Sequence, residues 1–200
     1  MKKVTLIMIL SFLLTGCTGI PTGLKAVDNF KIEKYLGTWY EIARLDHSFE
    51  RGLTNVSATY TLREDGGIDV LNKGYNSKKE KWNEIKGKAY FIKDKNLGRL
   101  KVTFFWPFYG SYNVINLDKE NYSYALVCGP KRSYFWILAR EKFLEKPVID
   151  DLIKTADNLG FETAEDDNRC GPCEGHLGWI VRTNGRRSRD DAFTDRYGGG

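Results

Sequence analysis

The most reactive side chains in this sequence belong to four cysteines and two histidines. Cys170 and Cys173 are separated by two residues, and thiols at this spacing can form a redox-active disulfide or bind a metal. His176 follows them, but such a metal site would lack a fourth ligand. No strand is expected before the pair and no helix after it, so we favour an exposed disulfide or a free dithiol. A redox protein that uses Cys170 and Cys173 is the alternative.

The remaining residues do not predict catalysis. His47 and His176 are not spaced as a metal-binding pair, and the chain contains no nucleophile elbow and no phosphate-binding loop. Aspartate and glutamate are frequent, but no pattern brings two carboxylates together in a dry site. We therefore expect a protein that is not an enzyme and that requires neither a cofactor nor a metal. A lipid-active enzyme is kept as the alternative.

The first sixteen residues have the pattern of a signal peptide. Lys2 and Lys3 precede the apolar run Val4–Leu14, which is shorter than the roughly 20 residues that span a membrane. The sequence Leu14-Thr15-Gly16-Cys17 that follows resembles the bacterial lipobox. This resemblance implies cleavage before Cys17 and acylation of that residue, with anchoring through its acyl chains. Because Thr18 is not the aspartate typical of inner-membrane retention, we expect the periplasmic face of the outer membrane.

Charge and composition indicate a globular domain and exclude one class of partner. The chain is 42% hydrophobic and 28% charged, which is typical of globular proteins. The formal net charge of +5 falls to +3 when Lys2 and Lys3 are removed. No long basic block alternates with aromatic residues, so nucleic acid is not an expected partner.

The central hundred residues alternate as short strands separated by turn signals such as Glu64-Asp65-Gly66-Gly67. Eight strands are predicted, with a break near Gly87 in the fourth: Thr38–Leu45, Thr54–Leu62, Ile68–Tyr75, Trp82–Ile92, Leu100–Trp106, Tyr109–Leu117, Tyr122–Val127 and Tyr134–Ala139. Short connections make consecutive strands antiparallel, and eight of them can close into a barrel without a free edge. Cys128, at the end of the seventh run, is expected to be a small buried residue.

Helical spacing occurs once, after Pro147, and ends at Gly160. The predicted fold is therefore all-β, an eight-stranded antiparallel up-and-down barrel with one C-terminal α-helix packed outside. Such a barrel is wide enough for one small ligand. The predicted organisation is a signal peptide (1–16), a lipidated N-terminus and linker (17–29), the barrel with its helix (30–163), and a divergent, disordered tail (164–200) in which 179–181 could supply a final strand.

Three motifs in this order resemble the signatures of the lipocalin family. They are Gly37-Thr38-Trp39 at the start of the first strand, Asp118–Leu126 from the turn into the seventh, and Trp136–Arg140 at the end of the eighth. Further stretches are similar to the bacterial lipocalins of the apolipoprotein D-like group. The resemblance implies a carrier of a small hydrophobic ligand, a fatty acid or lysophospholipid, that supports envelope maintenance. A homodimer is left open.

A physical reason links two of these residues. One end of a barrel exposes apolar side chains, and Trp39 can cover them if a partner lies over its indole ring. Arg140 can supply that partner through a cation–π contact of about 0.5–2 kcal/mol. Gly37, Trp39 and Arg140 are therefore the predicted barrel-closure residues.

The lining of the ligand site is predicted from strand alternation and from the resemblance. Tyr112 and Trp136 match pocket residues of the family. Alternation adds Leu138, which shares a face with Trp136, and the residues Val114 and Asn116, which share a face with Tyr112. Aromatic residues of four other strands are further candidates. The complete predicted lining is Tyr60, Tyr75, Tyr90, Phe105, Tyr112, Val114, Asn116, Trp136 and Leu138. The aromatic run Phe104–Tyr109 is interpreted as a strand connection, with membrane contact as the alternative.

Overall fold

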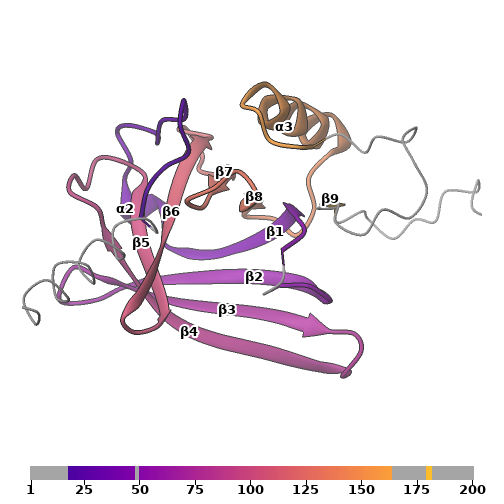
Figure 1. The fold of residues 1–200 in the computed structure, drawn as a ribbon, viewed down its shortest axis with the longest axis horizontal. Coiled ribbons are helices and arrows are strands. Elements are labelled where there is room, and N and C mark those ends of the chain that lie inside the picture. Colours follow the sequence, from indigo (N-terminus) through magenta and orange to yellow (C-terminus); the bar gives the residue numbers. More distant parts are fainter. Residues whose placement is uncertain (1–17, 48–49, 164–178, 182–200) are drawn as a thin grey trace, which may run out of the picture.

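The computed structural model describes residues 18–47, 50–163 and 179–181, the last without its side chains. Within these ranges the chain forms a closed antiparallel barrel, as the sequence predicts (Figure 1). Its eight consecutive strands are β1 (Gly37–Leu45), β2 (Leu53–Leu62), β3 (Ile68–Asn76), β4 (Lys81–Phe91), β5 (Arg99–Phe105), β6 (Phe108–Leu117), β7 (Tyr124–Cys128) and β8 (Phe135–Ala139). Each strand pairs with the next, and β1 pairs with both β2 and β8, which closes the sheet.

Two strands depart from the prediction by more than a one-residue shift of their bounds, each for a local reason. β4 continues through Gly87 without the predicted break. A Cβ atom at this position would lie only 2.6 Å from the Thr103 carbonyl oxygen and 2.7 Å from the ring of Phe104, so only glycine fits there. Glycine thus allows two strands to approach closely without ending the strand. β7 begins at Tyr124 rather than Tyr122, because Tyr122 has a φ of +54° within the turn that Asp118 organises.

Apolar side chains gather on both faces of this sheet. The face inside the barrel forms one cluster, which we call the inner cluster: Phe30, Tyr35, Trp39, Tyr60, Ile68, Val70, Ala89, Leu100, Val114, Leu117, Tyr122, Ala125, Val127 and Leu138. The outer face of β1, β7 and β8 forms a second cluster, which includes Ile42, Phe135 and Ile137. Strands buried on both faces explain why β7 and β8 are almost continuously apolar in sequence.

Helix α3 (Lys146–Asn158) covers this second cluster from outside, on the side of β1, β7 and β8 (Figure 1). Pro147 lies in its first turn, where a missing N–H costs nothing. Leu152 and Ala156 are its buried residues, and Phe161, just after the helix, stacks on Phe135 with ring centroids 4.2 Å apart. The predicted outside helix is thus observed.

The segment before the barrel is bound to it rather than extended as a linker. Val27 donates its N–H to the Val114 carbonyl, and Gly98 donates to Val27, both at 2.9 Å. Leu24 and Phe30 are buried. The segment continues into α2 (Ile32–Tyr35), a helix that strand alternation does not predict.

A ninth strand, β9 (Trp179–Val181), pairs with residues 43–45 of β1. This is the final strand that the sequence suggests at 179–181, within a tail otherwise predicted to be disordered, and it lies at the part of β1 that β2 no longer covers. The predictions for 164–178 and 182–200 lie outside the described residues. No helix of the described chain has both the length and the apolar character needed to cross a membrane.

Candidate functional site

One end of the barrel is closed by a layered stack around Trp39. The Arg140 guanidinium carbon lies 4.2 Å from the centroid of the indole ring, and the Tyr35 ring stacks with it at 4.5 Å. Arg140 also donates to the carbonyls of Thr38 at 3.0 Å and Lys34 at 2.7 Å. Gly37 has a φ of +91°, and a Cβ atom there would lie 3.3 Å from Arg140 Nη1. The stack therefore seals the end at which β1 begins.

Three tyrosines lie directly inside this seal. The Tyr112 hydroxyl lies 2.7 Å from the Tyr35 hydroxyl and 3.0 Å from that of Tyr60, from which it accepts a hydrogen bond. Burial raises the pKa of all three phenols, so they remain neutral. The void beside them has a volume of about 10 Å³, which is the space of a single water molecule. This half of the barrel is therefore filled by its own side chains.

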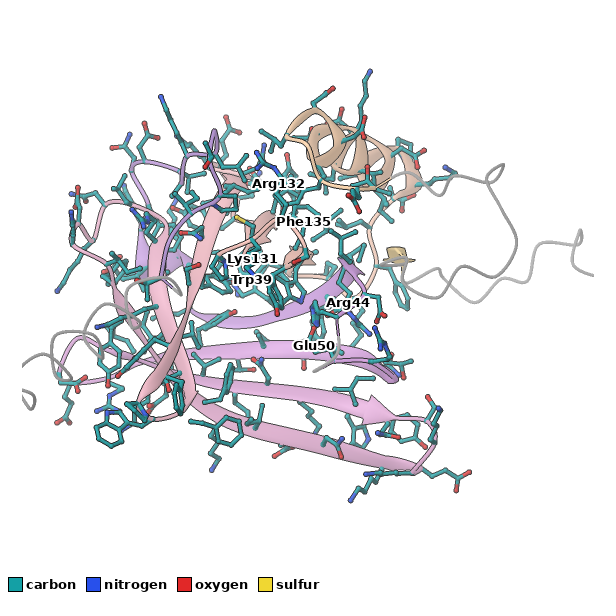
Figure 2. All side chains as sticks on the ribbon, in the orientation of Figure 1. Trp39, Arg44, Glu50, Lys131, Arg132 and Phe135 are labelled. Carbon is teal, nitrogen blue, oxygen red and sulfur yellow. The ribbon has the colours of Figure 1, made fainter. Side chains whose placement is uncertain are left out.

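A group of polar residues lies further along the inner face, which we call the mouth cluster: Glu41, Arg44, His47, Glu50 and Trp136. Arg44 pairs with Glu41, and its Nη2 donates to the carbonyls of Glu50 and Leu53, each at 3.1 Å. Trp136 Nε1 donates to Glu50 Oε2 at 3.0 Å. Figure 2 shows Arg44 and Glu50 close together near the ends of β1 and β2.

Burial governs the charges in the mouth cluster. It lowers the pKa of His47 to about 4, and the nearby positive charge of Arg44 acts in the same direction. It raises the pKa of Glu50, although the hydrogen bond from Trp136 and the charge of Arg44 oppose this. His47 is therefore neutral near pH 7. The Nε of Arg44 is buried and has no hydrogen-bond partner among the described residues.

The structure brings five of the predicted lining residues to the inner face. Tyr60 and Tyr112 border the small void, and Trp136 packs against the inner cluster. Val114 and Leu138 belong to the inner cluster, with 0% and 6% exposure, so they form wall rather than open surface.

Four predicted lining residues do not lie on the inner face. Tyr75 pairs with Trp82 and shares its face with Lys73, whose ammonium lies over the Trp82 ring at the barrel surface. Tyr90 follows the inward-facing Ala89 and contacts Tyr109 outside. These two residues were assigned from residue type without the strand register.

The other two corrections have separate causes. Phe105 is 71% exposed at the end of β5, because it follows the inward-facing Phe104 and alternation turns it to the outer face. Asn116 follows a bulge in β6 and pairs with Leu126 of the outer cluster, so Leu117 takes the inward position in its place.

Arg44 and Glu50 are not predicted by strand alternation. In β1, Trp39 and Glu41 point inward, and strict alternation would next turn Ala43 inward. A bulge between Glu41 and Ala43 turns Arg44 inward instead. The one signal in the sequence that could have indicated Arg44 is the presence of a charged residue within an otherwise apolar part of β1.

A second concavity, the outer hollow, lies on the outside of β2–β5. Its volume is about 720 Å³, and it is lined by Thr59, Thr61, Asp69, Val70, Leu71, Lys86, Gly87, Lys88, Tyr90, Thr103, Phe104, Trp106 and Tyr109. Most of these residues alternate with members of the inner cluster, which places them on the opposite face of the sheet.

The cysteines give little support for chemistry in the described chain. Cys17, Cys170 and Cys173 lie outside the described residues. Cys128 is a buried free thiol whose pKa burial raises to about 12. The described residues contain no group of three side chains that could hold a metal.

Comparison with known proteins agrees with this architecture. The family model described as a lipocalin-like domain matches residues 30–167. The chain belongs to the lipocalin family. The outer membrane lipoprotein Blc of Vibrio cholerae is 52% identical over 163 residues, which cover 82% of this chain and 95% of the relative. Blc of Escherichia coli K12 is 50% identical over 157 residues, 78% of this chain and 88% of the relative.

More distant relatives extend the comparison. Apolipoprotein D of Macaca fascicularis is 34% identical over 169 residues, covering 80% of this lipocalin and 86% of the relative. Insecticyanin from Manduca sexta is a solved structure with a TM-score of 0.61 and 20% identity, covering 84% of this chain and 88% of that one, and it shows the fold alone. The predicted family, the absence of enzymatic function and the outer-membrane location are confirmed by these relatives.

Proposed function

We propose that this lipocalin binds a small hydrophobic ligand, a fatty acid or lysophospholipid, inside its barrel and carries or stores it at the periplasmic face of the outer membrane, supporting envelope maintenance. Acylation of Cys17 would supply the anchor. The observation that carries the proposal is the closed barrel itself. Its inner face is apolar from the Trp39–Arg140 seal up to the mouth cluster.

Apolar burial would provide most of the binding free energy, at roughly 25 cal/mol for each Å² removed from water. The void of about 10 Å³ is too small for an acyl chain. A ligand must therefore lie above the tyrosines, or displace inner side chains as it enters. The Nε of Arg44, which has no partner within the described part of the chain, gives the acidic head group of such a ligand a hydrogen-bond donor at the mouth cluster.

Two positions on β2, three residues apart and on opposite faces, provide a direct test. Ala58 packs against the inner cluster, whereas Thr61 is exposed and lines the outer hollow. Phenylalanine is compatible with a strand at both positions. The probe is a dansyl-labelled fatty acid, whose fluorescence rises when it leaves water.

We expect Ala58→Phe to weaken probe binding by about ten-fold or more, because the added ring occupies the space that the ligand needs. Thr61→Phe should bind as the unaltered protein does. If Thr61→Phe weakens binding and Ala58→Phe does not, the ligand occupies the outer hollow and the proposal is wrong. If neither variant changes binding, the barrel interior is not the site.

A further inference from the structure

The three most exposed of the large hydrophobic side chains described lie together at the turn between β5 and β6. Phe105, Trp106 and Phe108 are 71%, 81% and 71% exposed, and no other described hydrophobic of that group exceeds 50%. Single exposed apolar residues are ordinary, but three large aromatics within four positions form a patch that usually marks an interaction surface. We call these three residues the aromatic tip.

The aromatic tip is held in place by a paired hairpin. Phe105 pairs with Phe108 across the turn, and Phe104, just before it, packs inward against the inner cluster. The hairpin therefore presents the aromatics without any need to order them on contact. In Figure 1 the end of the β5–β6 hairpin lies on the side of the barrel away from α3.

Basic side chains border the aromatic tip. Lys86 and Lys88 line the outer hollow together with Trp106, and the Lys101 ammonium lies 4.9 Å from the centroid of the Tyr109 ring. Asp69 is the one acidic residue among those that line the hollow, and it is paired with Arg63. Exposed tryptophan and phenylalanine beside lysines match the interface of a membrane with anionic lipids.

The beginning of the described chain is attached to the same hairpin. The Thr18 carbonyl accepts a hydrogen bond from Arg99 Nη2 at 3.3 Å, and the Gly19 carbonyl accepts one from Asn113 Nδ2 at 3.2 Å. Arg99 and Asn113 are paired across β5 and β6. The aromatic tip is six residues further along β5, about 20 Å at the rise of a strand. Cys17 directly precedes Thr18 in the sequence.

We propose that the aromatic tip inserts into the interfacial layer of a phospholipid membrane and forms a second contact beside the acyl anchor. The proposal rests on the proposed function only for the anchor at Cys17. The acyl chains implied at Cys17 would hold the chain at the membrane, but they leave the orientation of the barrel open. A second contact through the aromatic tip would fix that orientation.

The test uses the acylated protein, purified from its membrane, in vesicles of phosphatidylethanolamine, phosphatidylglycerol and a brominated phosphatidylcholine. Bromine quenches tryptophan only at close range. We expect the lipid to quench part of the emission, and Trp106→Phe to abolish that part. Trp82→Phe is the matched control, because Trp82 is half-exposed on β4, and this substitution should leave the quenched part intact.

A second measurement follows transfer of the protein between vesicles. The triple variant Phe105→Ser, Trp106→Ser and Phe108→Ser should leave its vesicle about ten-fold faster or more, since even partial burial of three aromatics contributes more than 1.4 kcal/mol. Phe143→Ser, at another exposed aromatic, should leave at the original rate. All of these side chains are exposed, so the variants should fold normally.

Two results would overturn the proposal. One is quenching that is the same with and without Trp106. The other is a triple variant that leaves its vesicle at the original rate. If the mass of the particle in vesicle-free solution also differs between this variant and the unaltered protein, the aromatic tip is a contact between two copies of the chain. Intact mass reports acylation of Cys17 separately, and the Ala58→Phe experiment reports ligand binding. Failure of the proposed function and failure of the membrane contact are thus distinguishable.

Discussion

Replacing Arg140 with alanine removes three contacts from the closed end of the barrel. These are the stack on Trp39 at 4.2 Å and the hydrogen bonds to the carbonyls of Thr38 and Lys34. The cation–π contact contributes about 1 kcal/mol at a half-buried site. Each hydrogen bond contributes about 1 kcal/mol after allowance for solvent. The free energy of unfolding should therefore fall by about 3 kcal/mol.

Urea unfolding, followed by tryptophan fluorescence, measures this loss. With a slope near 2 kcal/mol per molar urea, the midpoint should fall by roughly 1.5 M. Arg140→Lys should lose an intermediate amount, because an ammonium cannot stack and donate to both carbonyls in the geometry of a guanidinium. The substitution should lower the midpoint and leave the slope of the urea dependence nearly unchanged, since the surface exposed on unfolding is almost the same.

Arg63→Ala is the matched control. Arg63 also lies near a strand end, but its partners Asp65 and Asp69 are solvent-exposed. Exposed pairs contribute about 0–1 kcal/mol, so this variant should shift the midpoint little. If Arg140→Ala and Arg63→Ala lose the same small amount, the seal does not stabilise the barrel and the reasoning from its geometry is refuted.

Two further predictions concern pH and thiol reactivity. His47 has a pKa of about 4 in the folded protein, below its ordinary value of 6.5, so the unfolded chain binds the proton more readily and stability falls as the pH drops from 6.5 toward 4. When the pH is lowered from 7.5 to 4.5, the free energy of unfolding, measured by urea titration, should fall by about 2 kcal/mol less in His47→Gln than in the unaltered protein. Equal losses in the two proteins would show that His47 is not desolvated. Cys128, with a thiol pKa of about 12, should resist iodoacetamide at pH 8 in the folded protein and react in urea, as peptide mass spectrometry can show; labelling of the folded protein at this residue would contradict its burial.

The strands and the outside helix could be predicted because they depend on local patterns. Alternation with turn signals located all eight strands within a few residues, and the helical spacing after Pro147 located α3. The barrel closure could be inferred as well, since consecutive short connections leave few alternatives for eight antiparallel strands.

The lining of the barrel could be predicted only in part. Alternation fixes which residues share a face, but one bulge reverses the faces beyond it, as it does at Arg44 in β1 and Asn116 in β6. Tyr75 and Tyr90 show the other source of error, because residue type alone does not decide which face a tyrosine occupies. Register between strands decides it, and that depends on distant parts of the chain.

The sequence by itself determined the barrel, the helix and the pairing of Trp39 with Arg140, because these follow from periodicity and from motifs that lie in a fixed order. Only the tertiary structure decided how much of the interior is filled, that charged residues gather at the mouth cluster, and that the aromatic tip and the start of the chain share one hairpin. The physical reason is that packing density and burial are sums over residues far apart in the chain. No local pattern can report such a sum.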